Sequence, residues 1–207
     1  MVVDNTTATP LLQQPLSLGA DVCVVSDTKA MTGHADLLLG HAAARDAGHA
    51  EMLRTWRTRL GVIPGPMEAW LAHRSLGTLH VRLMQQCRSA QIIAEYLAER
   101  AERGSSIRNV RYPGLPGDRS HPLAVKQMSQ FGAVISFEVP DAAAAARFFA
   151  ASRLVYEATS FGGLHTSAER RARWGGDAVS AGFIRLSVGL EDVNDLVRDL
   201  AQALDAI

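Results

Sequence analysis

The sequence predicts an α/β fold in two parts, an α/β part over residues 1–65 and an α+β part over residues 66–207. An apolar segment at residues 21–25 has the character of a buried parallel strand and follows a short helix, which gives a β-α-β start. A single apolar stripe then runs along a long helical stretch in the middle of the chain. Beyond that stretch the apolar period changes to two, which is typical of a half-buried strand.

The first part is expected to run strand, helix, strand. Thr9 and Pro10 have the pattern of a helix N-cap followed by proline at the first helical position. Gly19 is expected to stop this helix. The segment Gly61–Pro66 is expected to break a later one. The expected elements are a strand ending at Val3, a helix over 11–18, strands over 21–25 and 37–44, and a helix over 47–60.

The second part begins with the longest helical stretch, about residues 67–103, interrupted near Gly77. Its apolar residues recur every three or four positions and predict one buried face. Further on, Ile135, Phe137 and Val139 alternate with other residues and share one face of a strand. The remaining expected elements are a helix over 141–152, strands over 154–160 and 182–188, and a closing helix over 191–206 with acids in its first turn.

The bulk composition limits the class of protein. The chain has 207 residues, 47% of them hydrophobic, so it can bury a sizeable core. Its formal net charge of zero argues against nucleic acid and against a membrane surface as main partner. No apolar run approaches the roughly 20 residues of a membrane span, and the N-terminus has no secretory signal pattern. Cys23 and Cys87 lie in apolar segments and are expected to be reduced, as in a cytoplasmic protein.

Lysine is rare in this sequence. Of its 21 basic residues, only Lys29 and Lys126 are lysines. Arginine replaces lysine as a charge but not as an amine nucleophile. Lys29 follows the second predicted strand, and Asp4 follows the first. A right-handed crossover makes these strands parallel, so we expect Asp4 and Lys29 at one sheet edge, facing one cleft, where ligands bind in open α/β sheets.

The residue types at this edge match the needs of a pyridoxal-phosphate (PLP) enzyme. Such an enzyme needs an amine for the aldehyde, a carboxylate that keeps the pyridine nitrogen protonated, and hydroxyls or amides for the phosphate. Lys29, Asp4 and the pair Ser26 and Thr28 supply these types in one unit. The alternative is a solvated loop lysine beside a turn-forming acid.

Motifs along the whole chain carry a family resemblance. The N-terminal ones are Asp4-Asn5-Thr6, Ser26-x-Thr28-Lys29 and Gly33-His34-x-Asp36, and the C-terminal ones are Tyr112-Pro113-Gly114-Leu115, Ser160-x-Gly162-Gly163 and Ile184-Arg185-Leu186-Ser187-Val188-Gly189. Together they resemble the trans-sulfuration family of PLP enzymes, which includes cystathionine γ-synthase and γ-lyase. The resemblance implies that residues 1–65 are the C-terminal part of the PLP-binding large domain of an aspartate aminotransferase-like fold. Residues 66–207 would then be the linking helix and the smaller α+β C-terminal domain.

The resemblance also implies roles for single residues. Lys29 would hold the PLP aldehyde covalently and Asp4 would pair with the pyridine nitrogen. Arg185 would bind the substrate α-carboxylate as a bidentate clamp, and Ser160 would lie near it and near Lys29. Arg185 interrupts an otherwise apolar strand, for which the alternative reading is an edge-strand arginine in a salt bridge. The remaining implied contacts are those of Ser26 and Thr28 with the phosphate.

The implied function is that of a PLP-dependent lyase or transferase of sulfur amino acids, working by elimination or replacement at the β or γ carbon. We expect a cytoplasmic protein with a small sulfur amino acid as substrate, homo-oligomeric in the full-length family, and no metal, nucleic-acid or membrane partner. The resemblance covers only the C-terminal half of the family, so we expect a truncated chain that is weak or inactive alone. The alternative is an inactive remnant, or a non-catalytic partner subunit of a full-length relative.

Three features depart from the family pattern or lie outside it. Ala30 stands where the family usually has an aromatic residue, and Leu164-His165-Thr166-Ser167 replaces an acidic-serine-leucine sequence. Both leave the substrate preference open. The arginines around Trp174 are expected to form a solvated helix face, with contact to an anion as the alternative; these arginines are Arg170, Arg171 and Arg173.

Overall fold

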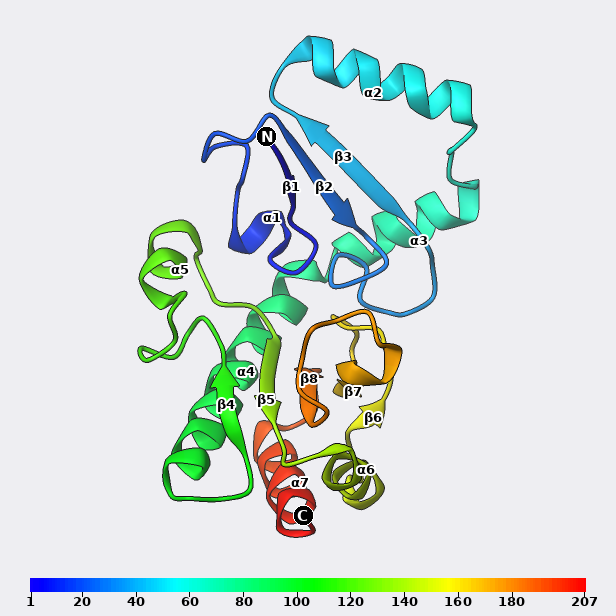
Figure 1. Ribbon diagram of the computed structural model, residues 1–207. Coiled ribbons are helices and arrows are strands. Elements are labelled where there is room, and N and C mark those ends of the chain that lie inside the picture. Colours follow the sequence, from blue (N-terminus) through cyan, green and yellow to red (C-terminus); the bar gives the residue numbers. More distant parts are fainter.

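Two separate sheets, joined by one long helix, make up the fold in the computed structural model, which describes all residues 1–207 (Figure 1). The predicted α/β class is confirmed. The first sheet has the order β1-β2-β3 and the second the order β4-β5-β8-β7-β6. The boundary between residues 65 and 66 stays a prediction.

The first sheet contains the predicted parallel pair. It consists of β1 (Val2–Asp4), β2 (Val22–Ser26) and β3 (Gly40–Ala44). β1 and β2 run parallel, with Val2 opposite Val22 and Asp4 opposite Val24, whereas β3 is antiparallel to β2. The carboxyl ends of β1 and β2 therefore meet at one edge of the sheet.

The predicted helix over 11–18 is wrong in its extent. The helix α1 covers only Thr9–Leu12, and Gln13 after it is extended, with φ −145° and ψ 141°. Gln13 forms a β-bridge with Met128, and Pro15 disfavours helical backbone at Gln14, so neither residue continues the helix. The chain then turns back into β2.

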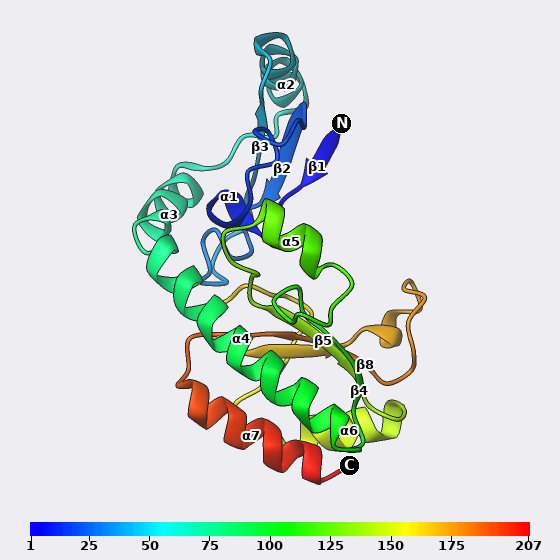
Figure 2. The ribbon, with the colours of Figure 1, turned by 90° about the vertical axis from the view of Figure 1, so that its left-hand side faces the viewer.

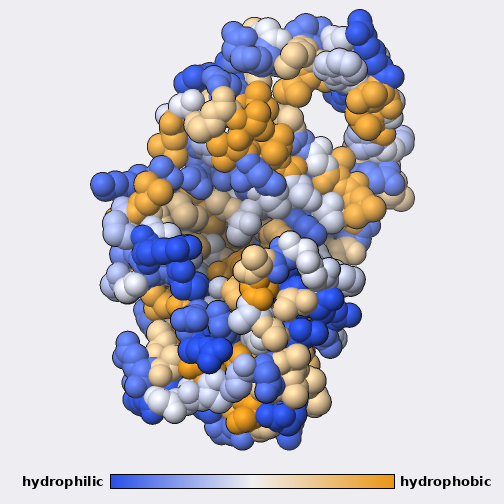
Figure 3. Space-filling model, viewed as in Figure 1, coloured by the Kyte–Doolittle hydropathy of each residue, from blue (hydrophilic) through white to orange (hydrophobic).

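Two helices follow the first sheet. Asp46 caps α2 (Ala47–Leu60) by accepting a hydrogen bond from the backbone N–H of His49, and Gly61 ends it with φ 67°. No residue of α2 is buried. A hollow of about 740 Å³ separates this helix from β3, and it is open in the space-filling view (Figure 3). α3 (Pro66–Leu76) leads from there to the long helix.

The second sheet has helices packed on one face (Figure 2). Its core joins the inward residues of β5 and β8 to three helices, α4, α6 and α7. The predicted alternation is confirmed, since Ile135 and Phe137 are fully buried. The elements are α4 (Leu79–Glu102), β4 (Arg108–Arg111), α5 (His121–Gln127), β5 (Val134–Glu138), α6 (Ala142–Ala151), β6 (Tyr156–Glu157), β7 (Ser167–Arg170), the 3-10 helix η1 (Arg171–Trp174), β8 (Phe183–Ser187) and α7 (Val193–Asp205).

The long helix α4 belongs to both cores. Its first half contributes Leu79, Leu83 and Cys87 to the core beneath β2. Its second half contributes residues from Ala90 to Leu97 to the core of the second sheet. The single apolar stripe is thus confirmed, but its two halves face different partners. Burial raises the pKa of the Cys87 thiol to about 11, and both Cys87 and Cys23 are free and buried. None of the helices combines the length and apolar character needed to cross a membrane.

A buried acid fixes the connection between β4 and α5. The Asp118 carboxylate accepts bonds from Arg111 Nε and Nη2, at 2.7 and 3.0 Å, and from the backbone N–H of Tyr112 at 3.1 Å. It also accepts from the backbone and side chain of Ser120. The hydrogen bonds from Arg111, against an opposing effect of burial, hold the pKa of Asp118 far below its ordinary value.

We expect Asp118→Asn to lower the free energy of unfolding by about 2–3 kcal/mol at pH 7, because Arg111 loses the charge of its buried partner. The pKa of Asp118 is lowered in the folded state. Its contribution to the free energy of unfolding is therefore complete above the ordinary pKa of about 3.9 and is lost as the pH falls below that value. Urea unfolding of both proteins between pH 7 and pH 2 measures this. A difference that stays constant over that range would contradict the account, and Asp36→Asn, at an exposed acid, is the matched control.

Candidate functional site

Lys29 and Ser160, which are far apart in sequence, meet between the two parts of the fold. Lys29 lies in the turn after β2, and its Nζ donates to Ser160 Oγ at 3.2 Å. The same Nζ lies 5.2 Å from the centroid of the Phe161 ring. Neither lysine of the chain has a carboxylate within 4 Å. The Lys29 amine therefore has one neutral partner and no ion pair.

Arg185 reaches the same aromatic ring from β8. Its guanidinium carbon lies 5.1 Å from the centroid of Phe161. Its Nη2 donates to the Thr159 carbonyl at 2.6 Å and to Glu169 Oε2 at 2.9 Å. Burial lowers the pKa of Arg185. Its Nε and Nη1 have no hydrogen-bond partner in the protein, so three N–H donors stay available on an anchored side chain.

Glu169 holds Arg185 in place. It stands opposite Arg185 in the pairing of β7 with β8, and its side chain is 1% exposed. Its carboxylate also accepts from Arg171 at 2.9 Å and from the Trp174 indole. Burial alone would raise the pKa of Glu169, but hydrogen bonds from Arg171 and Trp174 hold it below its ordinary value. The predicted solvated helix face is wrong for Arg170, which ends β7, whereas Arg171–Trp174 form the 3-10 helix η1, in which no residue is buried.

Asp4 lies at the end of β1, exposed to solvent. Its Oδ1 accepts from the backbone N–H of Thr6 at 2.9 Å, and hydrogen bonds with Thr6 lower the pKa of Asp4. The carboxylate is therefore charged, and it is exposed to solvent. Asp4 borders a hollow of about 330 Å³, whereas Thr28 and Ser160 border a separate one of about 370 Å³. That Asp4 and Lys29 face one cleft stays a prediction.

The two hydroxyls predicted for the phosphate differ in their availability. Thr28 Oγ1 donates to the Leu39 carbonyl at 3.2 Å and accepts from the Leu39 N–H at 3.0 Å. Because a hydroxyl has one proton, Thr28 must release Leu39 before it can donate to an anion. The Ser26 hydroxyl has no partner in the protein, so it is the freer donor.

The sequence reasoning missed Phe161 and Glu169. Phe161 had a signal, an aromatic residue set between Ser160 and two glycines. The signal for Glu169 was weaker, because a single acidic residue suggests a partner for Arg185 only once its segment is known to be a strand beside β8. Both residues touch a predicted site residue and none of the predicted roles included them.

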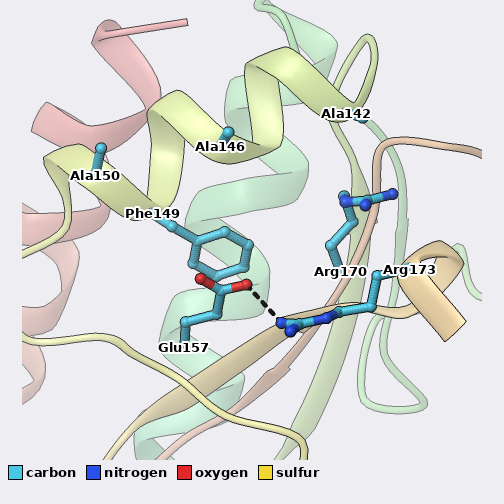
Figure 4. Close-up of a pocket in the computed structure, with 7 residues that line it drawn as sticks. All are labelled: Ala142, Ala146, Phe149, Ala150, Glu157, Arg170 and Arg173. Carbon is cyan, nitrogen blue, oxygen red and sulfur yellow. Dashed lines mark hydrogen bonds and ion pairs between the residues drawn. The ribbon is translucent and has the colours of Figure 1, made fainter.

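A larger hollow, of about 640 Å³, lies between α6 and η1 (Figure 4). Arg173 Nη1 pairs with Glu157 Oε1 there at 2.9 Å, so these two charges cancel within the hollow. It contains no amine and no free carboxylate. Nor does the chain bring three His, Cys, Asp or Glu side chains together as a metal site would require. The group around Lys29 is the candidate site.

Comparisons with known proteins agree on one family. A family model described as Cys/Met metabolism PLP-dependent enzyme matches residues 1–205. The chain is 58% identical over 205 residues to a Streptomyces coelicolor protein provisionally named cystathionine gamma-lyase, covering 99% of this chain and 51% of the relative. It is 40% identical to the cystathionine gamma-lyase of Saccharomyces cerevisiae, covering 99% and 54%. Other relatives are named cystathionine gamma-synthase and cystathionine beta-lyase.

Solved structures give the same picture. Apo CalE6, a methionine gamma lyase from Micromonospora echinospora, matches with a TM-score of 0.91 and 41% identity, covering 99% of this chain and 55% of that chain. The resemblance inferred from the sequence is confirmed. The chain spans about half the length of the curated relatives it matches.

We expect Glu169→Gln to lower the free energy of unfolding by about 2–3 kcal/mol, because Arg185 and Arg171 lose the charge of a buried partner. Urea denaturation followed by tryptophan fluorescence measures the loss. Asp177→Asn is the matched control, since Asp177 is 40% exposed and pairs with Arg171 alone. The control should cost about 0–1 kcal/mol. Equal losses in the two variants would show that Glu169 does not anchor Arg185.

Proposed function

Because the chain belongs to the family of PLP-dependent enzymes of Cys/Met metabolism, we propose that it carries the lysine-bearing part of a PLP-dependent lyase or transferase for sulfur amino acids. The observation that carries the proposal is the state of Lys29 Nζ, which meets a neutral hydroxyl and no carboxylate. An amine outside an ion pair is available to bind an aldehyde. The relatives' names span γ-lyase, γ-synthase and β-lyase, so the proposal covers elimination or replacement at the β or γ carbon.

The residue types fit PLP. Lys29 offers the amine, and Asp4 offers a charged, solvent-exposed carboxylate for the pyridine nitrogen. Ser26 offers a free hydroxyl for the phosphate. When bound, PLP supplies an electron sink for the charge left on the substrate carbon.

The remaining side chains bind and orient the substrate in this proposal. Arg185 receives the substrate α-carboxylate on Nε and Nη1, while Glu169 and the Thr159 carbonyl hold Nη2. With PLP bound to the substrate, the free Lys29 amine would take the proton from the substrate Cα as general base. Ser160 Oγ steers the lysine amine through the bond that it already accepts.

The phosphate is the group that this chain supports least. A phosphate dianion is best held by several charge-assisted hydrogen bonds. Ser26 and Thr28 are neutral, and the Thr28 proton is already given to Leu39. Two or three missing bonds of about 1.5–3 kcal/mol each imply an affinity that is lower by about a thousandfold or more. We therefore expect the 207 residues on their own to bind PLP weakly and to turn over little substrate.

A second candidate function is that of a partner subunit that binds another polypeptide without doing chemistry. The observation that favours it is an apolar surface on and between α2 and α3, where large side chains are about half exposed or more. The exposed side chains are Trp56, Leu60, Val62, Ile63, Met67 and Trp70. The same surface supports a proposed homo-oligomer.

The two free, buried cysteines support a proposed cytoplasmic location.

Borohydride trapping tests the cofactor role. The chain is incubated with PLP, reduced and digested, and the label on each lysine peptide is measured by mass spectrometry. We expect Lys29 to carry about ten times more label than Lys126, because an ordered amine gains from orientation. Lys126, exposed on α5, is the internal reference. Lys29→Arg keeps the charge and should abolish the preference, whereas Lys126→Arg should leave the Lys29 label unchanged.

Label spread evenly over Lys29 and Lys126 would contradict the cofactor role. That outcome, together with tight binding of a second polypeptide to α2 and α3, would favour the partner-subunit function instead.

A further inference from the structure

A buried arginine on α4 holds the turn that carries Lys29. Arg82 is 6% exposed and has no carboxylate within 4 Å. Its Nη1 donates to the Ala30 carbonyl and its Nη2 to the Met31 carbonyl, each at 3.1 Å. Nη2 also donates to the Ser75 carbonyl at 3.1 Å, and Nε to Thr78 Oγ1 at 3.1 Å. Every nitrogen of the guanidinium therefore has an oxygen acceptor, as a buried cation requires.

The turn after β2 is shaped around this guanidinium. Gly33 has φ +72°, and a Cβ built on it would lie 2.1 Å from Arg82 Nη1. A side chain at this position would push the guanidinium out of its place. The two carbonyls that Arg82 binds belong to the residues directly after Lys29. Arg82 thus fixes the backbone of Lys29 without touching its amine.

One helical turn later, Gln86 holds the other half of the site. Its Nε2 donates to the Gly163 carbonyl at 2.7 Å and to the Val188 carbonyl at 3.1 Å. Gly163 is three residues after Ser160, and Val188 three residues after Arg185. Gln86 is buried, and its Oε1 has no hydrogen-bond partner. The buried amide oxygen of Gln86 makes no hydrogen bond, so the two hydrogen bonds donated by Nε2 are the only polar contacts that its side chain makes.

The two halves also touch directly. A Cβ on Gly162 would lie 2.6 Å from the Ala30 nitrogen, so only glycine allows the Ser160 loop this close to the Lys29 turn. The Gly162 N–H donates to Ser187 Oγ at 2.8 Å, which ties the loop to β8. The position of Lys29 relative to Ser160 thus depends on two side chains four residues apart on one helix.

We propose that Arg82 and Gln86 are positioning residues that set the Lys29 amine against Ser160 and Arg185. This proposal rests on the proposed function of Lys29. Arg82 acts through the carbonyls of Ala30 and Met31, and Gln86 acts through those of Gly163 and Val188. Neither side chain touches the reacting amine.

Trapping selectivity in the full 207-residue chain tests the proposal. The ratio of label on Lys29 to label on Lys126 is measured after reaction with PLP and borohydride, in Arg82→Met, Arg82→Lys and Gln86→Met. We expect the ratio to fall about tenfold in Arg82→Met, since a shift of about 1 Å can cost on the order of a hundredfold in reaction rate. Gln86→Met should lower it about threefold to tenfold, as the loss of neutral hydrogen bonds implies. Arg82→Lys should not rescue it, because an ammonium lacks the planar fork.

The controls lie on the same helix. Arg88→Met and Gln85→Met make the same chemical changes at exposed positions and should keep the native ratio. Circular dichroism and thermal unfolding show which variants are folded, and if Arg82→Met unfolds, Arg82→Lys and Gln86→Met decide. A folded variant of Arg82 and one of Gln86 that both keep the native ratio would overturn the proposal and leave the proposed function standing. A native chain without any preference for Lys29 would remove the proposed function first.

Discussion

The arrangement of the candidate site depends on a cation buried without a counter-charge. The Arg82 guanidinium lies in the interior and meets only carbonyl and hydroxyl oxygens. Burying such a group is costly unless its donors are satisfied, so the carbonyls around it cannot move without leaving a charge unpaired. Two of those carbonyls belong to Ala30 and Met31, the residues directly after Lys29. The energetic constraint on Arg82 thereby becomes a geometric constraint on the lysine.

Around the amine, the charges are balanced more locally. Lys29 and Arg185 both approach the Phe161 ring, whose face attracts cations. Glu169 supplies a buried negative charge and shares it between Arg185 and Arg171. This leaves Lys29 as the basic group without an acid and Arg185 as an anchored cation with free donors.

The sequence predicted the parts of this picture that are local or periodic. The β-α-β start, the apolar stripe of α4 and the alternation around Phe137 follow from spacing alone. The strand β7 escaped prediction because its sequence, Ser-Ala-Glu-Arg, has low strand propensity and no apolar alternation. Its acid is stable inside only because Arg171, Trp174 and Arg185 surround it, and that surrounding is a tertiary fact. Arg82 and Gln86 escaped for the same reason, since a polar pair beside an apolar stripe is ordinarily the solvated rim of a helix.

The candidate site residues were proposed from their chemistry and from the family resemblance. Whether each of their side chains already has a hydrogen-bond partner within the protein could not be predicted. The hydrogen bonds between the Thr28 hydroxyl and the Leu39 backbone, and the lack of a partner for the Ser26 hydroxyl, could not be predicted from the sequence, because they depend on how the loop after β2 folds back. The cofactor role of Lys29 can be tested with a crystal structure of the chain grown with PLP and reduced with borohydride. We expect continuous density from Lys29 Nζ to the cofactor, with the Asp4 carboxylate beside the ring nitrogen. Cofactor density on Lys126 alone, or on Lys29 with Asp4 turned away from the ring, would contradict it.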